Sequence, residues 1–523
     1  MKSLVKYLRN YKKETVLSPL FKLLEATFEL FVPLVMASII DKGIGNGDKG
    51  YIFKMCLVLV VLGVIGLVCS ITAQFFAAKA AVGFAAKLRY ALYDHIQSLS
   101  FSEIDTLGTS TLITRMTSDV NQVQNGVNLT LRLLLRSPFI VFGAMIMAFT
   151  IDVKAALVFV VAIPLLSVVV FLIMYFSIPL YKKVQSGLDR VLMLTRENLT
   201  GARVIRAFNK EQDEIESFEK ENHALTKLQM FVGRISALMN PVTYIIINGA
   251  IAALIYIGAL RVDSGAITQG EVVALVNYMS QILVELVKMA NLIITVTKAL
   301  ACAKRIENVF DIESGIAEEK QTADAVEGSP FIEFKNVSFA YSGAGENAVS
   351  NISFTVNRGE TVGVIGGTGC GKSTIVSLIP RYYDTTEGEV LIRGVDVKRM
   401  KLSELRQMVG MVMQKAVLFK GTIRENMQWG KKDARDEEIY EALDISQSRE
   451  FVENKPLKLD EPVEQGGKNL SGGQKQRLTI ARALVRRPEL LILDDSASAL
   501  DYATDARLRT ALRQLDGDVT TFI

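Results

Sequence analysis

The stretch GGTGCGKST, residues 366–374, decides the fold of the second half of this 523-residue chain. It follows the short apolar run TVGVI and leads into the helix-forming run STIVSLI. Its spacing matches the pattern G-x-x-x-x-G-K-[ST], in which backbone N–H groups and a helix N-terminus hold anionic phosphate. A strand, this loop and a helix in succession predict an α/β phosphate-loop domain that binds a nucleotide.

Each polar residue of the loop has an expected task. Lys372 brings a positive charge to the outer phosphates, and Ser373 offers a hydroxyl ligand to Mg²⁺. The loop residues expected to bind nucleotide are Gly366, Thr368, Gly369, Gly371, Lys372, Ser373 and Thr374.

A second half of the same site is expected at LLILDD, residues 490–495. A run of four large apolar residues that ends in acids is typical of a buried strand with carboxylates at its C-terminal end. Asp494 is expected to hold Mg²⁺, directly or through water. Asp495 stands where a hydrolytic site needs a base or a water-positioning group.

A second glycine-rich helix start lies between these two motifs, in NLSGGQKQRLTIARAL. A helix opened by glycines also suits phosphate binding. One nucleotide does not need two such loops from one chain, which indicates that this one serves a nucleotide held by another subunit. The residues expected to do so are Ser471, Gly472, Gly473 and Gln474.

The first part of the chain is too apolar for a soluble domain. Half of the chain is hydrophobic (50%), and the mean hydropathy is +0.28. A helix needs roughly 20 apolar residues to cross about 30 Å of hydrocarbon. Six stretches satisfy this, near residues 17–40, 52–78, 131–152, 155–179, 239–261 and 271–297. The predicted organisation is an all-α transmembrane domain over 1–310, a linker over 311–330 and the nucleotide-binding domain over 331–523, truncated at its C-terminal end.

Charge predicts how the chain lies in the membrane. The first 13 residues carry five basic side chains, Lys2, Lys6, Arg9, Lys12 and Lys13, which indicates a cytoplasmic N-terminus in the cell membrane. Six spans then place the C-terminal domain in the cytoplasm as well. The segments 79–130 and 180–238 contain long stretches without proline, so helices of about 45 residues can extend roughly 70 Å as cytoplasmic stalks. A net charge of +4 and the lack of a basic stripe argue against a nucleic-acid partner.

Charged residues inside the spans are costly and therefore candidates for function. Glu285 and Lys288 are three residues apart, close enough to pair on a helix. Polar neighbours on the same stretch are Asn277, Tyr278, Gln281 and Asn291. Two interpretations stay open, a polar lining of a central cavity and ordinary helix contacts. Glu25 and Glu29 are expected at the cytoplasmic edge.

Together these motifs carry a family resemblance. Residues 331–523 resemble the nucleotide-binding domain of ABC transporters, a RecA-like phosphate-loop fold, and LSGGQ is that family's signature. With six spans ahead of it, the whole chain resembles an ABC exporter half-transporter of the multidrug and lipid type. The resemblance implies ATP and Mg²⁺ as cofactors. It also implies that two such domains close head to tail around two ATP molecules, each held between one chain's phosphate loop and the other chain's signature.

The resemblance also assigns residues that a local pattern does not. It implies that Tyr341 stacks on adenine, that Gln414 links the metal and the γ-phosphate to the membrane domain, and that Asp501 belongs to a loop that crosses the dimer interface. It further implies short coupling helices at the stalk tips, matched here by residues 119–125 and 201–210. Phe208 would be the apolar plug into the partner's ATPase domain.

One departure from the family concerns the catalytic position. The family's hydrolytic pattern has glutamate directly after the metal-binding aspartate, whereas this chain has Asp495, one methylene shorter. A carboxylate displaced by roughly 1 Å can cost about 100-fold in rate. The site is therefore expected to bind ATP but to hydrolyse it weakly. An intact signature beside a weakened base resembles the degenerate-site subunit of a heterodimeric exporter.

The function expected from the sequence is ATP-driven export of amphipathic small molecules or lipids, as one half of a dimer whose other chain supplies the catalytic glutamate. The alternative is a regulatory nucleotide-binding membrane subunit that hydrolyses nothing and gates a partner. Asp495 is compatible with both. The sequence leaves open the transported substrate, the choice between homodimer and heterodimer, and the family's switch histidine, whose position falls after Ile523.

Overall fold

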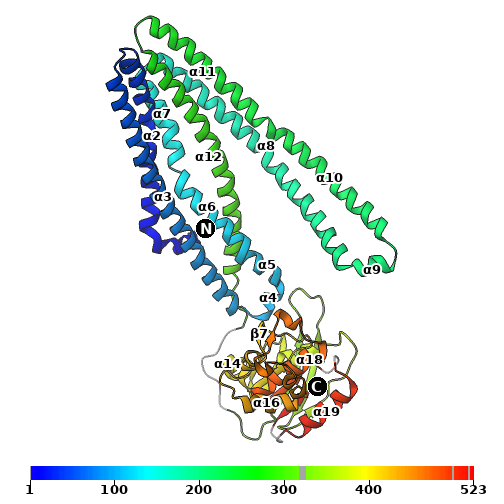
Figure 1. The fold of residues 1–523 in the computed structure, drawn as a ribbon. Helices are drawn as coiled ribbons and strands as arrows, with labels where there is room; N and C mark the ends of the chain where they lie inside the picture. Colours follow the sequence, from blue (N-terminus) through cyan, green and yellow to red (C-terminus); the bar gives the residue numbers. More distant parts are fainter. Residues whose placement is uncertain (1, 317–324, 497–499, 516–518) are drawn as a thin grey trace. The chain divides into compact units, whose positions relative to one another are not determined.

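The computed structural model describes residues 2–316, 325–496, 500–515 and 519–523 (Figure 1). The chain divides into two compact units. The first comprises Met1–His95 and Leu112–Asp311, and the second comprises Ile96–Thr111 and Ile312–Ile523. Residues 317–324 of the expected linker, and Ser498 and Ala499 of the expected interface loop, lie outside the described residues.

Long helices build the N-terminal part of the chain. Two of them, α8 and α10, lie side by side and are joined by the short helix α9 (Figure 1). The helices are α1 (Lys2–Val5), α2 (Lys12–Ser38), α3 (Lys49–Ser98), α4 (Phe101–Leu107), α5 (Thr109–Thr114), α6 (Val120–Leu133), α7 (Arg136–Ile151), α8 (Val153–Thr200), α9 (Ala202–Ala207), α10 (Glu211–Ala237), α11 (Met239–Asp263) and α12 (Gln269–Phe310).

Six helical stretches within the described residues are long and apolar enough to cross a membrane, which confirms the predicted six-helix transmembrane domain. They are Lys6–Ile44, Lys49–Ser98, Thr109–Ile151, Val153–Thr200, Glu211–Asp263 and Gln269–Phe310. Helix α3 alone has 50 residues, and such a helix is about 75 Å long, as the expected stalks require.

Small residues let these helices approach one another closely. A Cβ added at Gly126 of α6 would lie 2.3 Å from the Cβ of Ala299 on α12, so this crossing requires glycine. Buried polar groups find partners across helices, as where the Tyr278 hydroxyl of α12 donates to the Leu30 carbonyl of α2 at 2.6 Å. Packing and satisfied hydrogen bonds together hold the bundle in one arrangement.

The structure corrects one expected coupling segment. Asp119 is buried at 2% exposure and accepts hydrogen bonds from Arg305 of α12, at 2.5 and 3.0 Å. The residues after it belong to α6, which packs along α12 inside the first unit. The short helix that belongs to the ATPase unit is α4, residues 101–107. The prediction for residues 119–125 is therefore wrong, because a buried ion pair holds that segment within the bundle.

The second unit has two main sheets. An antiparallel sheet has the order β2-β1-β4-β5, and a parallel sheet has the order β3-β10-β9-β6. The strands are β1 (Ile332–Phe339), β2 (Val349–Val356), β3 (Thr361–Val362), β4 (Glu387–Ile392), β5 (Val395–Asp396), β6 (Val409–Val412), β7 (Gly421–Thr422), β8 (Pro462–Val463), β9 (Leu490–Leu493) and β10 (Thr520–Phe522). The helices are α13 (Lys372–Leu378), α14 (Leu402–Met408), α15 (Ile423–Gln428), α16 (Asp436–Ile445), α17 (Arg449–Glu453), α18 (Gly472–Val485) and α19 (Tyr502–Arg513).

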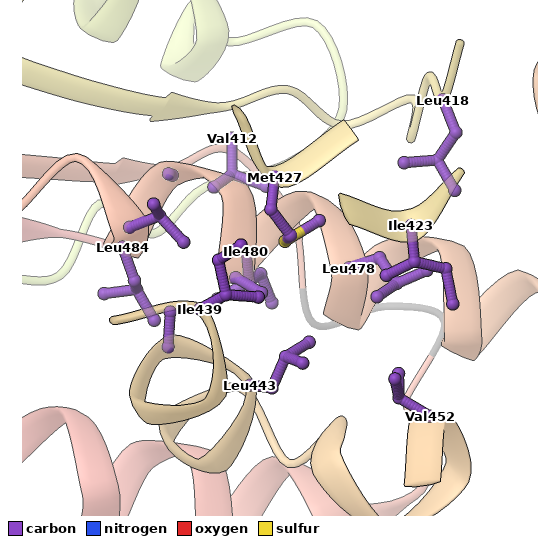
Figure 2. Packing of buried hydrophobic residues seen from close by; sticks show 14 of the residues in the cluster. Val412, Leu418, Ile423, Met427, Ile439, Leu443, Val452, Leu478, Ile480 and Leu484 are labelled. Atoms are coloured by element: carbon purple, nitrogen blue, oxygen red, sulfur yellow. The ribbon is translucent and has the colours of Figure 1, made fainter. Parts of the chain in front are cut away.

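Helix α18 runs through the centre of an apolar cluster. Its Leu478 and Ile480 are fully buried and face Ile439 and Leu443 of α16 and Met427 of α15 (Figure 2). Burial of one such side chain stabilises a fold by about 1.5–3 kcal/mol. The cluster therefore fixes the helix whose first turn carries the signature.

Candidate functional site

The loop between β3 and α13 has a backbone that only glycine adopts without strain. Gly369 and Gly371 have positive φ angles of 86° and 90°. A Cβ at Gly371 would lie 2.5 Å from Val349 Cγ1 and 2.7 Å from the Ala348 carbonyl oxygen. Successive N–H groups in such turns form a concavity that binds anions. The loop expected from GGTGCGKST is thus a phosphate-sized cradle that ends at Lys372, the first residue of α13.

Lys372 places its charge inside this cradle. Its Nζ donates to the carbonyl oxygens of Gly366 and Gly367, both at 2.7 Å. These bonds hold the ammonium against the loop that a phosphate would occupy. The remaining donor capacity of an ammonium group suits the oxygens of an anionic ligand.

The expected metal-binding residues meet across 121 positions of sequence. The Ser373 hydroxyl donates to Asp494 Oδ1 at 2.8 Å. Asp494 follows β9, which lies parallel to β6 and β10, and its N–H bonds to the Val412 carbonyl at 3.0 Å. Parallel strands end at one edge, so the carboxylate reaches the helix that starts at Lys372.

These residues fit a magnesium–nucleotide complex. The described residues contain no group of three or more His, Cys, Asp or Glu side chains that could hold a metal ion alone. A hydroxyl and one carboxylate instead leave most ligand positions to phosphate oxygens and water, which is the way proteins usually bind Mg²⁺. Ser373 and Asp494 are the residues that would hold the ion.

Asp495 and Gln414 face each other beside this pair. Gln414 Nε2 donates to Asp495 Oδ2 at 3.1 Å. Asp495 has a left-handed backbone, with φ of 47°, a conformation that aspartate tolerates better than most residues. The turn directs the chain out of β9 directly after the metal-binding position. The glutamine, expected as a link to metal and γ-phosphate, is therefore in contact with the residue at the base position.

Lys372, Asp494 and Asp495 line a cavity of about 450 Å³ at the end of β9. Other walls come from β10 and α19, including Leu508 and Arg509. No signature residue is among those that line it. The geometry of one chain thus brings the phosphate loop and the strand acids together and leaves the signature out.

The signature forms the start of α18 as a reciprocal cap. The Ser471 hydroxyl accepts from the Gln474 N–H at 3.3 Å, and Gln474 Oε1 accepts from the Ser471 N–H at 3.0 Å. Ser471 is exposed and Gln474 half-buried, and Gly472 has open space around its Cβ position. A capped, exposed helix N-terminus with its first glycine unobstructed can receive phosphate from outside the chain.

Tyr341 lies next to the phosphate loop's helix. Its hydroxyl forms a 3.0 Å hydrogen bond with the Thr374 hydroxyl of α13. Its ring contacts Tyr383 edge-on, with centroids 5.4 Å apart, and 38% of the residue is exposed. This position suits the expected stacking on adenine.

Two contacts near Tyr341 were not found by sequence reasoning. Tyr383 donates from its hydroxyl to Asp105 Oδ2 at 2.6 Å, and Phe101 of α4 lies against Tyr382 with ring centroids 4.5 Å apart. Burial, followed by the hydrogen bond to Asp105, raises the pKa of Tyr383 above its usual value, so the phenol remains a donor at physiological pH. The only local signals were the aromatic pair after α13 and the capping box of α4 at Ser100.

Asp501, which the family resemblance assigns to an interface loop, caps the start of α19. The Asp501 carboxylate caps α19 by accepting from the N–H and hydroxyl of Thr504, at 2.9 and 2.8 Å. These hydrogen bonds, of which the one from the backbone N–H has the largest effect, lower the pKa of Asp501.

Phe208 directly follows α9 and is 73% exposed. An apolar ring so exposed at a helix end is available for contact with another protein surface.

Comparisons with known proteins match both halves of the chain. Residues 15–286 match the ABC transporter transmembrane region, and residues 349–498 match the ABC transporter ATPase family. An uncharacterized ABC transporter ATP-binding protein of Mycobacterium tuberculosis is 36% identical over 525 residues, which covers 99% of this chain and 89% of the relative.

Two further relatives carry functional names. A Bacillus subtilis protein, named as a candidate multidrug export ATP-binding/permease protein, is 33% identical over 539 residues, or 100% of this chain and 91% of the relative. An ATP-dependent lipid A-core flippase of Syntrophus aciditrophicus is 31% identical over 441 residues, or 84% of this chain and 72% of the relative.

Proposed function

Since the chain belongs to the ABC transporter family, as a transmembrane region and an ATPase domain on one polypeptide, we propose that it is the slowly hydrolysing half of a heterodimeric exporter. As an ABC exporter half-transporter it is a multi-pass protein of the cell membrane with a cytoplasmic ATPase domain. Proteins of this family act as dimers that couple ATP hydrolysis to transport. The finer proposal concerns the partner, the weak site and the substrates, which are amphipathic small molecules or lipids.

Asp495 is the observation that carries the proposal. It follows the metal-binding Asp494 directly and accepts a hydrogen bond from Gln414. Its carboxylate stands one methylene short of the glutamate position, and a displacement of about 1 Å can cost about 100-fold in rate. Phosphate release by the purified chain alone, compared with release by the chain and its partner, tests the proposal. Transport by the partner that persists without ATP hydrolysis would favour the regulatory alternative.

The roles proposed for the chain's own residues follow from their positions. The ammonium of Lys372 neutralises charge on the outer phosphates, and the loop N–H groups orient them. Ser373 and Asp494 hold Mg²⁺, which when bound withdraws charge from the phosphate oxygens. Tyr341 stacks on the adenine ring. Asp495 accepts a proton from water slowly, because its carboxylate is set back.

The signature is proposed to act on the partner's nucleotide. Its separation from the cavity that holds Lys372 supports this, as does the open space at Gly472. Phe208 is proposed to enter the partner's ATPase domain, which would cover its exposed ring.

Ser471→Ala and Gly472→Asp are each expected to reduce ATP hydrolysis by the assembled pair at least about tenfold, because they remove a hydroxyl or add a negative charge where the partner's phosphates bind. The affinity of this chain's own site for ATP is expected to be unchanged, measured by photocrosslinking to this chain.

Thr422→Ala is the matched control for these two changes. Thr422 caps α15 through the same reciprocal arrangement with Glu425, so its loss mimics the capping defect alone. Full ATPase activity of the pair with either signature change would contradict the proposal. An equal loss with Thr422→Ala would assign the effect to helix capping.

Tyr383→Phe is expected to uncouple transport from hydrolysis. The change removes only the hydroxyl that donates to Asp105, next to the ring of Tyr341. Loss of one hydrogen bond to a charged group, about 1.5 kcal/mol, is expected to lower the number of molecules transported per ATP about tenfold while ATP binding is retained.

Asp105→Asn serves as the conservative counterpart, because its amide oxygen can still accept from Tyr383. Transport and phosphate release are measured together in proteoliposomes. A transport-to-hydrolysis ratio that is unchanged in both Tyr383→Phe and Asp105→Ala would show that this hydrogen bond carries no coupling.

A further inference from the structure

A polar cavity of about 370 Å³ lies within the transmembrane unit, between α2, α7 and α12. Its polar lining consists of Glu29, Asn277, Ser280, Gln281, Glu285 and Lys288. All its other lining residues are apolar. Glu285 and Lys288 thus line a cavity inside this chain. Glu29, which the sequence analysis expected at the cytoplasmic edge, shares this cavity with Glu285.

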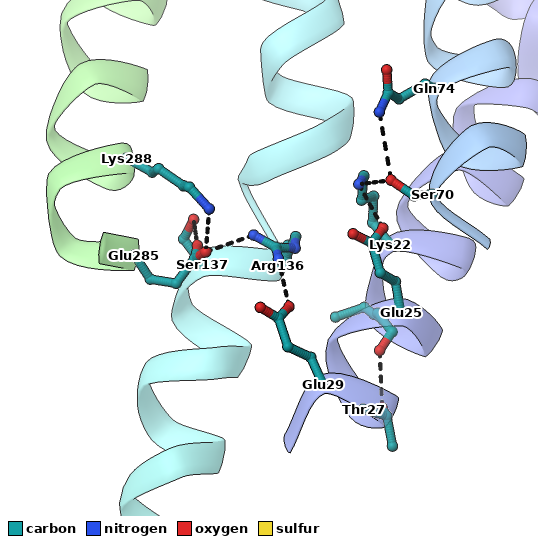
Figure 3. A network of polar contacts seen from close by, with 11 residues as sticks. Lys22, Glu25, Thr27, Glu29, Ser70, Gln74, Arg136, Ser137, Glu285 and Lys288 are labelled. Atoms are coloured by element: carbon teal, nitrogen blue, oxygen red, sulfur yellow. Dashed lines mark hydrogen bonds and ion pairs between the residues drawn. The ribbon is translucent and has the colours of Figure 1, made fainter. Parts of the chain in front are cut away.

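A buried ion pair lies between the charged side chains of this site (Figure 3). Arg136 Nη1 donates to Glu285 Oε1 at 2.6 Å, and the side chains are 8% and 3% exposed. The Ser137 hydroxyl donates to Glu285 Oε2 at 2.8 Å. Charges at such depth in a membrane protein are costly and mark functional sites. Both groups are held by fixed partners, so they form a framework for the charges at the surface of the cavity.

The two exposed charges come from different helices, α2 and α12 (Figure 3). Glu29 of α2 is 41% exposed, and its Oε2 accepts from Arg136 Nη2 at 2.7 Å. Lys288 of α12 is 42% exposed and donates to Glu285 Oε1 at 2.8 Å. That oxygen also accepts from Arg136, so Glu285 stays paired when Lys288 turns toward a ligand. One side of the site therefore offers a carboxylate and the other an ammonium group.

The charge balance of the cluster selects the ligand. Glu29 and Glu285 are negative and Arg136 and Lys288 positive, so the four sum to zero. A ligand with a single charge would leave an unbalanced charge in a medium of low dielectric constant, which is costly. A ligand with one positive and one negative group adds no net charge to the site.

Gln281 offers a second, independent reason to expect a donor. Its Oε1 is buried and has no hydrogen-bond partner among the described residues. A buried acceptor left without a donor costs free energy, which an N–H group from a ligand would recover. The carboxylate of Glu29 and the amide oxygen of Gln281 both suit a protonated amine.

We propose that this cavity binds a zwitterionic amphiphile, with its ammonium group toward Glu29 and Gln281 and its anionic oxygens toward Lys288. The apolar lining holds the first carbons of the hydrocarbon chain, whose remainder leaves the cavity. The proposal rests on the exporter function and names its substrate class. A phospholipid headgroup and a free zwitterionic amphiphile share this chemistry.

The test uses the full chain with its partner in nanodiscs of an anionic lipid, without nucleotide. Three probes share a twelve-carbon chain: dodecylphosphoethanolamine, dodecylamine and the singly charged phosphodiester dodecyl methyl phosphate. The zwitterion is expected to bind about tenfold more tightly than either singly charged probe, because it makes charge-assisted contacts at both ends. Equal binding of the three probes, or tighter binding of a singly charged probe, would overturn the proposal.

Two substitutions are expected to shift the preference in opposite directions. Glu29→Gln should lower the affinity for the zwitterion about tenfold and favour dodecyl methyl phosphate, whereas Lys288→Gln should favour dodecylamine. Arg136 and Glu285 stay paired with each other in both variants, so neither change leaves a buried charge unpaired. Lys298→Gln, on the same helix but outside the cavity lining, should change nothing. If Glu29→Gln or Lys288→Gln lowers the affinity for all three probes equally, the change is a structural defect and the proposal is contradicted.

Nanodiscs with and without phosphatidylethanolamine identify the source of the ligand. Competition by the bilayer lipid assigns a phospholipid, and its absence assigns a free amphiphile; each result supports the site. Because no nucleotide is present, failure of this binding leaves the ATPase proposal intact. Binding of the zwitterion by a pair that hydrolyses no ATP would support the cavity site and contradict the ATPase proposal.

Discussion

Lys372→Ala is expected to lower the affinity of this chain for ATP at least about 100-fold, because charge-assisted hydrogen bonds to phosphate contribute about 1.5–3 kcal/mol each and the lysine supplies more than one. The Lys372 ammonium lies against the Gly366 and Gly367 carbonyls, in the curve of the loop. Titration with a fluorescent nucleotide, together with photocrosslinking of labelled ATP to this chain, measures the loss.

Lys335→Ala provides the control for lost positive charge. Lys335 is an exposed lysine of β1 that pairs with Glu333, far in sequence from the loop. The thermal unfolding temperature should be similar for both variants, because within the described residues the Lys372 side chain bonds only to its own loop. Labelled nucleotide that still crosslinks to Lys372→Ala with unchanged affinity would show that the site is elsewhere.

The chain alone is expected to release phosphate about 100-fold more slowly than the pair, because we propose that the Asp495 carboxylate, one methylene shorter than that of glutamate, lies about 1 Å from the position that activates water. Asp495→Asn should then change hydrolysis by the pair only slightly, since little turnover passes through this site. Asp494→Asn should instead weaken Mg²⁺-dependent ATP binding at this site, because Asp494 and its hydrogen-bond partner Ser373 are the proposed metal ligands.

Asp495→Glu separates geometry from other defects. If reach is the only fault, the longer side chain should raise hydrolysis at this site, measured in a pair whose partner site is disabled. No gain would indicate a further altered residue, in the partner's signature or elsewhere in the site. Vigorous turnover by the chain alone, lost on Asp495→Asn, would show that the aspartate is a competent base and that the weak-site proposal is mistaken.

Much of the nucleotide site follows from local patterns. Lys372 and Ser373 lie in a continuous loop whose glycines need positive φ angles, so a short sequence carries both the shape and the chemistry. Asp494 could be assigned because a buried strand places its last residue at a predictable edge. Asp105 and Tyr383 could not, because their contact joins residues 278 positions apart, and the aromatic pair and the helix cap beside them do not indicate that they meet.

The transmembrane unit shows the same division. Apolar length predicted six helices, and the spacing of Glu285 and Lys288 predicted a pair that the structure confirms at 2.8 Å. Arg136 was not singled out, although it holds both Glu29 and Glu285. Arg136 contacts both carboxylates because α7 packs against α2 and α12, and this packing cannot be predicted from neighbouring residues.

The sequence by itself determined the elements that depend on near neighbours: six apolar helices, a glycine loop, a capped signature helix and a strand that ends in two acids. Only the tertiary structure decided which distant side chains meet. It assigned α4 rather than residues 119–125 to the ATPase unit, and it gathered three charges around one cavity, two of them paired with Arg136. The physical reason is range: helix propensity and capping act within about four residues, whereas ion pairs and cavities depend on how whole helices pack.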